Sequence, residues 1–271
     1  AIKYVMDEEA VLFLGAGFSY GGTNVSGGEM KVGRDLSYAI CDDLGITKSD
    51  NLTISSSRYI EDESCKKGLE KFIDFLHNEL ICVETTLDQD TICKLPWMRI
   101  YTTNYDNIVE VSSEKQGISR ETITITNAMY SAARNMEQAI VHINGFIKKL
   151  DKQTFYDEFK ITDDNYNRDG LLQSPWRNLF ETDLMKAKTV IFIGYSLKYD
   201  QELVRCIANL NIKEKCVFID CESLSGDDEF KIKRYGTLYK IGTAGFVQEI
   251  VEVAKDYTPQ IKKIELSGFE K

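Results

Sequence analysis

The chain carries five short apolar runs, and each of them is followed by glycine or by a polar residue. The runs are Ala10–Leu14, Met98–Tyr101, Ala139–His142, Thr189–Ile193 and Cys216–Ile219. Continuous apolar runs of this length, rich in β-branched and aromatic residues, are typical of strands buried on both faces of a parallel sheet. Helical patterns between the runs, such as Gln201–Leu210, supply the crossover connections. The sequence therefore predicts an α/β fold with a doubly wound parallel sheet.

Two intervals break this alternation and are predicted to be helical. In residues 45–95, several apolar side chains share one helical face: Leu69, Phe72, Ile73, Leu76 and Leu80. In residues 150–187, Ser174 and Pro175 are typical of an N-cap and a first-turn proline. We therefore expect one domain, residues 1–271, with a helical subdomain (45–95 and 150–187) inserted into a Rossmann-like core (8–44, 96–149 and 188–257). We expect residues 258–271 to be a linker toward regions outside this chain.

Acidic residues outnumber basic residues, 43 to 33, which gives a formal net charge of −10. This charge repels phosphate backbones and anionic membranes, so we expect no contact with nucleic acid and no membrane role. The sequence has no apolar stretch of the ~18 residues that a spanning helix needs. It also starts with neither a basic nor an apolar leader segment, so we expect no signal peptide.

The cysteines indicate neither disulfides nor a metal site. There are seven, no two of them have C-x-x-C spacing, and the chain has only two histidines, His77 and His142. Zinc sites need clustered thiolates or imidazoles. We therefore expect no bound metal and reduced, mostly buried thiols, which favour a cytoplasmic location.

The residues after the apolar runs are the candidates for a site, because ligands bind outside the carboxyl ends of the strands in an open parallel sheet. Every strand end carries glycine or a polar side chain that can hydrogen-bond a nucleotide. In chain order the candidates are Gly15, Ala16, Gly17, Phe18, Ser19, Thr103, Asn104, Asp106, His142, Gly145, Gly194, Ser196 and Asp220.

The segment Gly15–Gly17 is similar to a dinucleotide-binding turn. In such a turn glycine lets a pyrophosphate approach the backbone amides, and the N-terminus of the following helix favours the negative charge. The fingerprint is incomplete, because its last glycine would fall at Tyr20. A plain glycine turn at the end of a strand explains the segment equally well. No G-x-x-x-x-G-K-[ST] motif occurs, which excludes a P-loop NTPase.

Three of the polar candidates also have a structural interpretation. A lone histidine on an apolar strand, such as His142, is more often hydrogen-bonded structure than a catalyst, although Asn144 and Gly145 after it favour a functional position. Asn104 and Asp106 could form a turn and an N-cap for a helix over residues 107–113.

Taken in order, the strand ends resemble the sirtuin superfamily. Gly15–Ser19 is similar to the family's GAG-x-S loop, Thr102–Asp106 resembles its T-Q-N-x-D motif, and Gly194–Ser196 resembles its G-T-S motif. The segment His142–Gly145 stands where the family has its catalytic His-Gly, with two residues inserted. Asp220 stands where the family has an asparagine that holds the adenosine ribose.

Two departures from the family favour one of its branches. The chain has no zinc ribbon of two C-x-x-C pairs and no Pro-Asp-Phe-Arg segment after the first loop. Both are features of protein-deacylating sirtuins. The chain resembles instead the sirtuin-like domains of bacterial antiphage systems, the Thoeris proteins and the defence-associated sirtuins, which destroy NAD+ in infected cells. That resemblance implies a homo-oligomer and a phage protein trigger or partner defence subunit.

The resemblance also implies a role for each candidate in cleaving NAD+. Asn104 would orient water or ribose, Asp106 would contact the carboxamide, and His142 would act as a base toward a ribose hydroxyl or water. The other candidates would bind the dinucleotide: Gly15, Ala16, Gly17, Phe18, Ser19, Thr103, Gly194, Ser196 and, at the adenosine ribose, Asp220. The charge of Asp220 would favour NAD+ over NADP+, since it would repel a 2′-phosphate.

The first functional hypothesis is therefore an NAD+ glycohydrolase, an N-glycosidase, that acts in antiphage defence with NAD+ as its substrate and without a metal. The second is a module that binds NAD+ or ADP-ribose as a sensor or scaffold and does not turn it over. Protein deacylation ranks last, because the zinc ribbon is missing.

Overall fold

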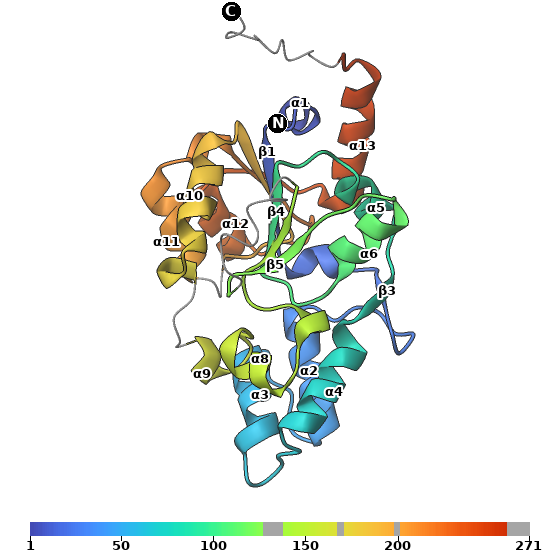
Figure 1. Ribbon diagram of the computed structural model, residues 1–271, viewed down its shortest axis with the longest axis vertical. Coiled ribbons are helices and arrows are strands. Elements are labelled where there is room, and N and C mark those ends of the chain that lie inside the picture. The colour runs from blue at the N-terminus through green and yellow to red at the C-terminus, as the bar shows by residue number, and fades with distance from the viewer. Residues whose placement is uncertain (127–137, 167–170, 198–200, 259–271) are drawn as a thin grey trace, which may run out of the picture.

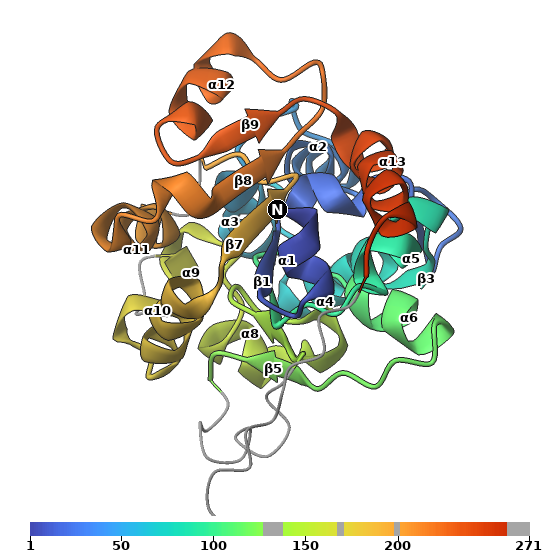
Figure 2. The ribbon, with the colours of Figure 1, turned by 90° about the horizontal axis from the view of Figure 1, so that it is seen from above.

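The computed structural model describes residues 1–126, 138–166, 171–197 and 201–258, and its centre is a seven-stranded sheet with the strand order β5-β6-β4-β1-β7-β8-β9 (Figures 1 and 2). Every neighbouring pair of these strands is parallel. The strands are β1 (Ala10–Leu14), β4 (Arg99–Thr102), β5 (Thr122–Thr124), β6 (Ile140–His142), β7 (Thr189–Ile193), β8 (Cys216–Ile219) and β9 (Thr237–Tyr239). The predicted fold class, a doubly wound parallel sheet, is confirmed.

The five apolar runs are the five central strands of this sheet. The runs at β1, β7 and β8 have the predicted bounds, while β4 and β6 each begin one residue later than expected. The two edge strands, β5 and β9, were not predicted. Each has three residues and includes threonine, and β9 is half exposed, so neither forms a continuous apolar run.

Helices cover both faces of the sheet, and side chains of β1 alternate between the two cores. Val11 and Phe13 pack into the first core, whereas Leu12 and Leu14 pack into the second. The first face carries α10 (Trp176–Lys186), α11 (Gln201–Leu210) and α12 (Gly226–Lys233), and the second carries α1 (Ile2–Met6), α5 (Leu87–Cys93), α6 (Ile108–Lys115) and α13 (Gly242–Lys255), as Figure 2 shows. All five residues of β1 are buried because both of its faces are covered.

A third apolar cluster lies in a group of helices beyond the carboxyl ends of the strands, in the lower half of Figure 1. The face of α4 that the sequence predicts is buried in it, including Phe72 and Leu76. The helices of this group are α2 (Gly33–Leu44), α3 (Leu52–Glu61), α4 (Leu69–Leu80), α8 (Lys152–Asp157) and α9 (Asp163–Tyr166). Short elements complete the described chain: β2 (Thr23–Asn24), β3 (Cys82–Glu84), and the 3-10 turns η1 (Ala16–Ser19), η2 (Ile147–Lys149), η3 (Leu171–Gln173) and η4 (Lys213–Lys215).

Three helices pack differently from the division expected in the sequence. Helix α2, expected in the Rossmann-like core, buries Leu36 and Ile40 in the third cluster. Helices α5 and α10, expected in the helical subdomain, bury Ile92 and Phe180 against the sheet. The pattern of an amphipathic helix reveals which face is apolar but not which surface covers that face.

One further finding concerns the helices as a group. In the part of the chain that the structure describes, no helix is long and apolar enough to cross a membrane.

Helix α10 offers a test of the packing on the first face of the sheet. Phe180 is fully buried, with its ring centroid 6.3 Å from that of Phe13 and 4.9 Å from that of Tyr101. Because Phe180→Ala removes these contacts and leaves a cavity, we expect it to lower the free energy of unfolding by about 3–5 kcal/mol in urea titrations. Met185 on the same helix is 56% exposed. Met185→Ala is the control, with an expected change within about 0.5 kcal/mol; equal losses in the two variants would contradict this packing.

Candidate functional site

Residues that follow β1 and β4 form one buried hydrogen-bonded network at the carboxyl edge of the sheet. The side-chain amide of Asn104 donates from Nδ2 to the carbonyl oxygen of Gly15 at 2.9 Å and to Ser19 Oγ at 3.1 Å. The hydroxyl of Ser19 in turn donates to Asp106 Oδ2 at 2.6 Å. Asn104, Asp106 and Ser19 are all buried. The structure thus brings Ser19 together with Asn104 and Asp106, two predicted site residues that are 85 and 87 positions away from it along the chain.

The orientation of the Asn104 amide follows from its partner. A backbone carbonyl can only accept a hydrogen bond, so the atom that faces Gly15 O has to be the nitrogen. The side-chain oxygen Oδ1 therefore points the other way, and no donor among the described residues binds it. Since Asn104 keeps 8% of its surface exposed, this oxygen is an acceptor that is available to a ligand or a water molecule.

Asp106 is held by internal donors at both carboxylate oxygens. Besides Ser19, the backbone N–H of Ile108 donates to Oδ1 at 3.1 Å, at the start of α6. Asp106 thus closes a turn before α6, but it is not the N-cap, which is Asn107 and makes no side-chain capping bond. Burial raises the pKa of the Asp106 carboxyl above its usual value, and this effect outweighs the hydrogen bonds and the nearby His142, which act to lower it.

His142, the last residue of β6, is 1% exposed and has a partner at each ring nitrogen. Nδ1 lies 3.0 Å from the backbone carbonyl oxygen of Asn104, and Nε2 lies 2.9 Å from Glu110 Oε1. The ring also packs against Phe146, with 4.4 Å between centroids. This is the environment of a structural, hydrogen-bonded histidine, and the ring offers no free nitrogen to a substrate.

The loop after β1 differs from the expected dinucleotide turn. The residues that follow Gly15 form the 3-10 turn η1 (Ala16–Ser19), so the α-helix N-terminus expected to face a phosphate is not there, and that prediction is wrong. The amide of Gly15 donates to Ile193 O and that of Gly17 to Gly194 O, both at 3.0 Å. These two amides, which were predicted to bind phosphate, are engaged within the protein.

Close packing of the backbone explains why positions 15 and 194 are glycine. A Cβ built on Gly15 would lie 2.4 Å from the carbonyl oxygen of Gly194, and one built on Gly194 would lie 2.5 Å from the amide nitrogen of Phe18. Gly194 also has a φ of +63°, a backbone conformation that favours glycine. The side chain of Phe18 is 1% exposed and lies in the second core, so only its backbone faces the loop.

The remaining candidates lie at the solvent-exposed rim of the carboxyl edge of the sheet. Ala16 is exposed, and Thr103, Ser196 and Asp220 are partly exposed. Asp220 Oδ1 accepts a hydrogen bond from the backbone N–H of Cys221 at 2.7 Å.

Two residues near the network were not among the site residues predicted from the sequence. Glu110, on the first turn of α6, binds His142, and Gln89 on α5 is buried and donates from Nε2 to the backbone oxygens of Phe18 and Tyr20. Both partners are more than 30 positions away along the chain. An acid or an amide in a helical pattern gives no signal for such contacts.

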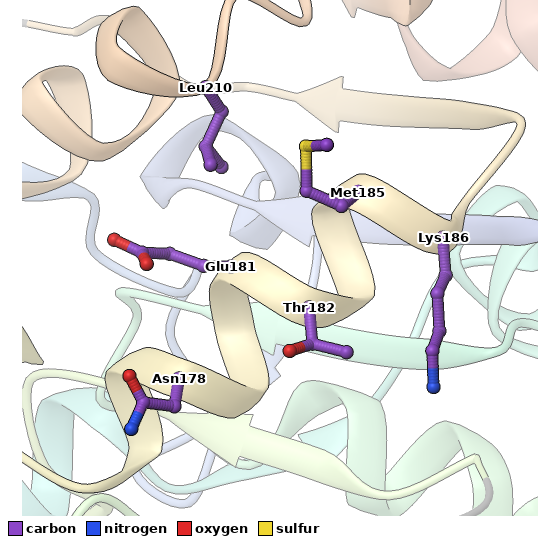
Figure 3. Close-up of a pocket in the computed structure, with 6 residues that line it drawn as sticks. All are labelled: Asn178, Glu181, Thr182, Met185, Lys186 and Leu210. Carbon is purple, nitrogen blue, oxygen red and sulfur yellow. The ribbon is translucent and has the colours of Figure 1, made fainter.

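The described residues contain no group of three or more histidine, cysteine or acidic side chains that could hold a metal ion. One cavity of about 520 Å³ lies away from the candidate site, as a shallow hollow on the outer side of α10 and the end of α11 (Figure 3). Its lining residues are Asn178, Glu181, Thr182, Met185, Lys186 and Leu210. None of them belongs to the network, and we assign the cavity no function.

Comparison with known proteins confirms the sirtuin-like resemblance. A family model of the SIR2-like domain matches residues 98–214, which include β4, β6 and β7. The chain is also similar to two curated proteins named NAD(+) hydrolase ThsA. It is 24% identical over 238 residues to the one from Acinetobacter baumannii (84% of this chain, 46% of the relative), and 22% identical over 196 residues to the one from Bacillus cereus (72% and 38%). The chain thus spans less than half the length of these relatives.

Solved structures of Sir2 proteins are also similar. One from work on the mechanism and regulation of Sir2 enzymes has a TM-score of 0.47 and 15% identity, and covers 94% of this chain and 98% of its own. Another, Sir2Af2 bound to a myristoylated histone peptide, has a TM-score of 0.43 and 13% identity, with the same coverage. The fold class stated above comes from the strand order, not from these scores.

The buried carboxyl of Asp106 predicts a particular dependence of stability on pH. Because its pKa is raised on folding, its favourable contribution is present at low pH and is lost as the pH rises through the folded-state pKa. Asp106→Asn stays neutral throughout. The free energy of unfolding of Asp106→Asn, relative to that of the wild type, should therefore increase as the pH rises above about 4 in denaturant titrations.

The control for this experiment is Asp50→Asn, which changes an exposed carboxyl. We expect no such trend for it. A stability difference for Asp106→Asn that stays constant across the pH range would contradict the assignment of a raised pKa to Asp106.

Proposed function

We propose that this chain is an NAD+ glycohydrolase, which cleaves NAD+ to nicotinamide and ADP-ribose. The C–N glycosidic bond breaks, and its electron pair returns to the nicotinamide ring, which leaves as a neutral molecule. The oxygen of water bonds to the ribose C1′ carbon and a proton is released. Because the leaving group is a cationic pyridinium, no general acid is required. The site has to hold the ribose and place the water.

Asn104 is the observation that carries this proposal. Its amide nitrogen is fixed by Gly15 O and Ser19 Oγ, so its oxygen is held in one direction without a protein donor among the described residues. A fixed acceptor of this kind at the carboxyl edge of β4 suits a ribose hydroxyl or the attacking water. The similarity to proteins named NAD(+) hydrolase supports the choice of NAD+ as the substrate.

The same similarity supports a proposal for the biological role and the partners. We propose that the chain acts in bacterial antiphage defence by depleting NAD+, as a homo-oligomer that a phage protein or a partner subunit activates. We also propose that it does so in the cytoplasm and without a metal. The relatives are more than twice as long as the part they share with this chain, so activation can depend on regions outside it.

The second candidate function is binding of NAD+ or ADP-ribose without turnover. The observation that favours it is His142, whose two ring nitrogens are both bound within the protein. A site whose expected base is enclosed can hold a nucleotide as a sensor and leave its bond intact.

The first test compares the two candidates directly. If Asn104 places the reacting groups, Asn104→Ala should lower nicotinamide release from NAD+ by about 100-fold or more, since loss of positioning alone can cost that much. The control is Asn178→Ala, on the outer surface of α10, which should release nicotinamide at the wild-type rate. Both variants are checked for folding by circular dichroism.

Each outcome of this assay assigns a function. Full activity in a folded Asn104→Ala variant would contradict the role given to Asn104. Absence of release by the wild type, together with NAD+ binding in calorimetry, would favour the sensor.

The rim residue Asp220 predicts the choice between dinucleotides. A carboxylate beside the adenosine ribose repels the 2′-phosphate of NADP+, so Asp220→Asn should raise binding of NADP+ relative to NAD+ by about tenfold or more. Asp227→Asn, at an exposed position on α12, should leave the ratio unchanged. A ratio that Asp220→Asn does not alter would place the adenosine ribose elsewhere.

A further inference from the structure

The hydrogen bonds of His142 determine which of its nitrogens carry protons. Nδ1 faces the backbone carbonyl oxygen of Asn104 at 3.0 Å, and a carbonyl oxygen can only accept. Nδ1 therefore carries a proton. Nε2 faces Glu110 Oε1 at 2.9 Å, so the second nitrogen also faces an oxygen of an acid.

Glu110 is placed to accept that second bond. Its Oε1 also accepts a hydrogen bond from the hydroxyl of Thr122 at 2.9 Å, and an ionised carboxylate oxygen is the group best suited to two donors at once. The side chain of Glu110 is only 19% exposed, and its other oxygen, Oε2, is buried and bonds to no other described atom. A charged partner stabilises a carboxylate that is largely removed from water in this way.

The backbone register explains why the ring cannot turn away from these partners. His142 is paired with Thr102 in β4 and with Thr124 in β5, so its backbone is held in the last pair of residues of each ladder. Phe146 packs over the ring. Rotation of the imidazole toward the edge of the sheet would break both hydrogen bonds inside a buried site.

We propose that His142 is a buried imidazolium paired with Glu110, and that this pair positions Asn104 and exchanges no proton with a substrate. One ring nitrogen holds the backbone of Asn104, whose side-chain oxygen is the acceptor described above. Glu110 on α6 accepts a hydrogen bond from the other ring nitrogen. Glu110 is therefore a positioning residue of the candidate site. For its effect on turnover this inference rests on the proposed NAD+ hydrolysis, whereas the protonation state of His142 does not depend on it.

Other titratable groups surround this pair. Asp106, in the loop before α6, is near enough for the positive charge of His142 to act to lower its pKa. Cys93 on α5 is near enough to Glu110 that the carboxylate acts to raise the pKa of the thiol, although burial has the larger effect. Neither group donates a hydrogen bond to the ring.

The protonation state can be measured directly by nitrogen-15 NMR, because the chain has only two histidines. His77 lies on the partly exposed side of α4, and His77→Gln leaves His142 as the sole imidazole signal. We expect both ring nitrogens of His142 to show a bound proton at neutral pH. A ring in which only Nδ1 carries a proton, with a free electron pair on Nε2, would overturn the proposal.

The role of Glu110 is tested in the same spectrum. Glu110→Gln keeps the shape of the side chain but removes its charge, so we expect the ring to lose its second proton and keep the one on Nδ1. Glu114→Gln, one turn further along α6 and exposed, is the matched control and should leave the signal unchanged. A doubly protonated ring in Glu110→Gln would show that Glu110 does not hold the proton.

Turnover separates a positioning role from that of a base. The nitrogen of asparagine can take the place of Nδ1 and donate to the Asn104 carbonyl, but asparagine cannot accept a proton from water. If His142 positions Asn104, His142→Asn should recover activity toward that of the wild type, to within about tenfold, while His142→Ala should not. A general base would make both variants slower by about 10²–10⁴-fold. Equal losses in folded variants would overturn the positioning role.

Failure of this inference and failure of the proposed function have different signatures. If the wild type releases no nicotinamide, the proposed function fails, and the NMR experiment still decides the state of His142. If the wild type is active and the ring is neutral with a free Nε2, NAD+ hydrolysis stands and the inference fails.

Discussion

The contact between the loops that follow β1 and β7 is the constraint on which the rest of the candidate site depends. Gly15 and Gly194 approach so closely that no side chain fits between them, and the Gly17 amide donates to the carbonyl oxygen of Gly194. Because β1 lies between β4 and β7, this contact fixes the Gly15 carbonyl beside the end of β4. That carbonyl in turn orients the amide of Asn104. A larger residue at either glycine would therefore disturb a hydrogen bond on the opposite side of β1.

The close contact between these two loops also limits which hydrogen-bond donors the carboxyl edge of the sheet presents to a ligand. The amides of Gly15 and Gly17 and the hydroxyl of Ser19 all donate within the protein. Diphosphate groups accept hydrogen bonds, so in the proposed complex their donors have to come from the exposed rim, where Ala16 and Ser196 lie. The net charge of −10 acts against an anionic ligand as well. Affinity for NAD+ would thus rest on ribose and nicotinamide contacts more than on the phosphates.

The sequence was sufficient for the parts of the fold that depend on burial alone. Five apolar runs became the five central strands, and the predicted apolar face of α4 is buried. The sequence was insufficient where a strand is short or where the partner of a side chain is distant along the chain. The strand at Thr122–Thr124 is too short and polar to be an apolar run, and Glu110 reaches His142 across 32 positions. The residues after β1 and β4 do meet at one edge of the sheet, but the orientations of the Asn104 amide and the His142 ring depend on backbone carbonyls, which no side-chain pattern encodes.

The position of His142 along its strand explains why the role that we propose for it differs from that of a general base. The resembled motif has its histidine directly before the glycine, whereas here two residues separate His142 from Gly145. His142 is the last residue of β6, and the two residues after it form a bend, so the position directly before Gly145 lies outside the strand. His142 is paired with Thr102, the last residue of β4, and its ring nitrogens meet the Asn104 carbonyl and Glu110. In that position the imidazole fixes the backbone of Asn104, and both of its ring nitrogens are bound within the protein.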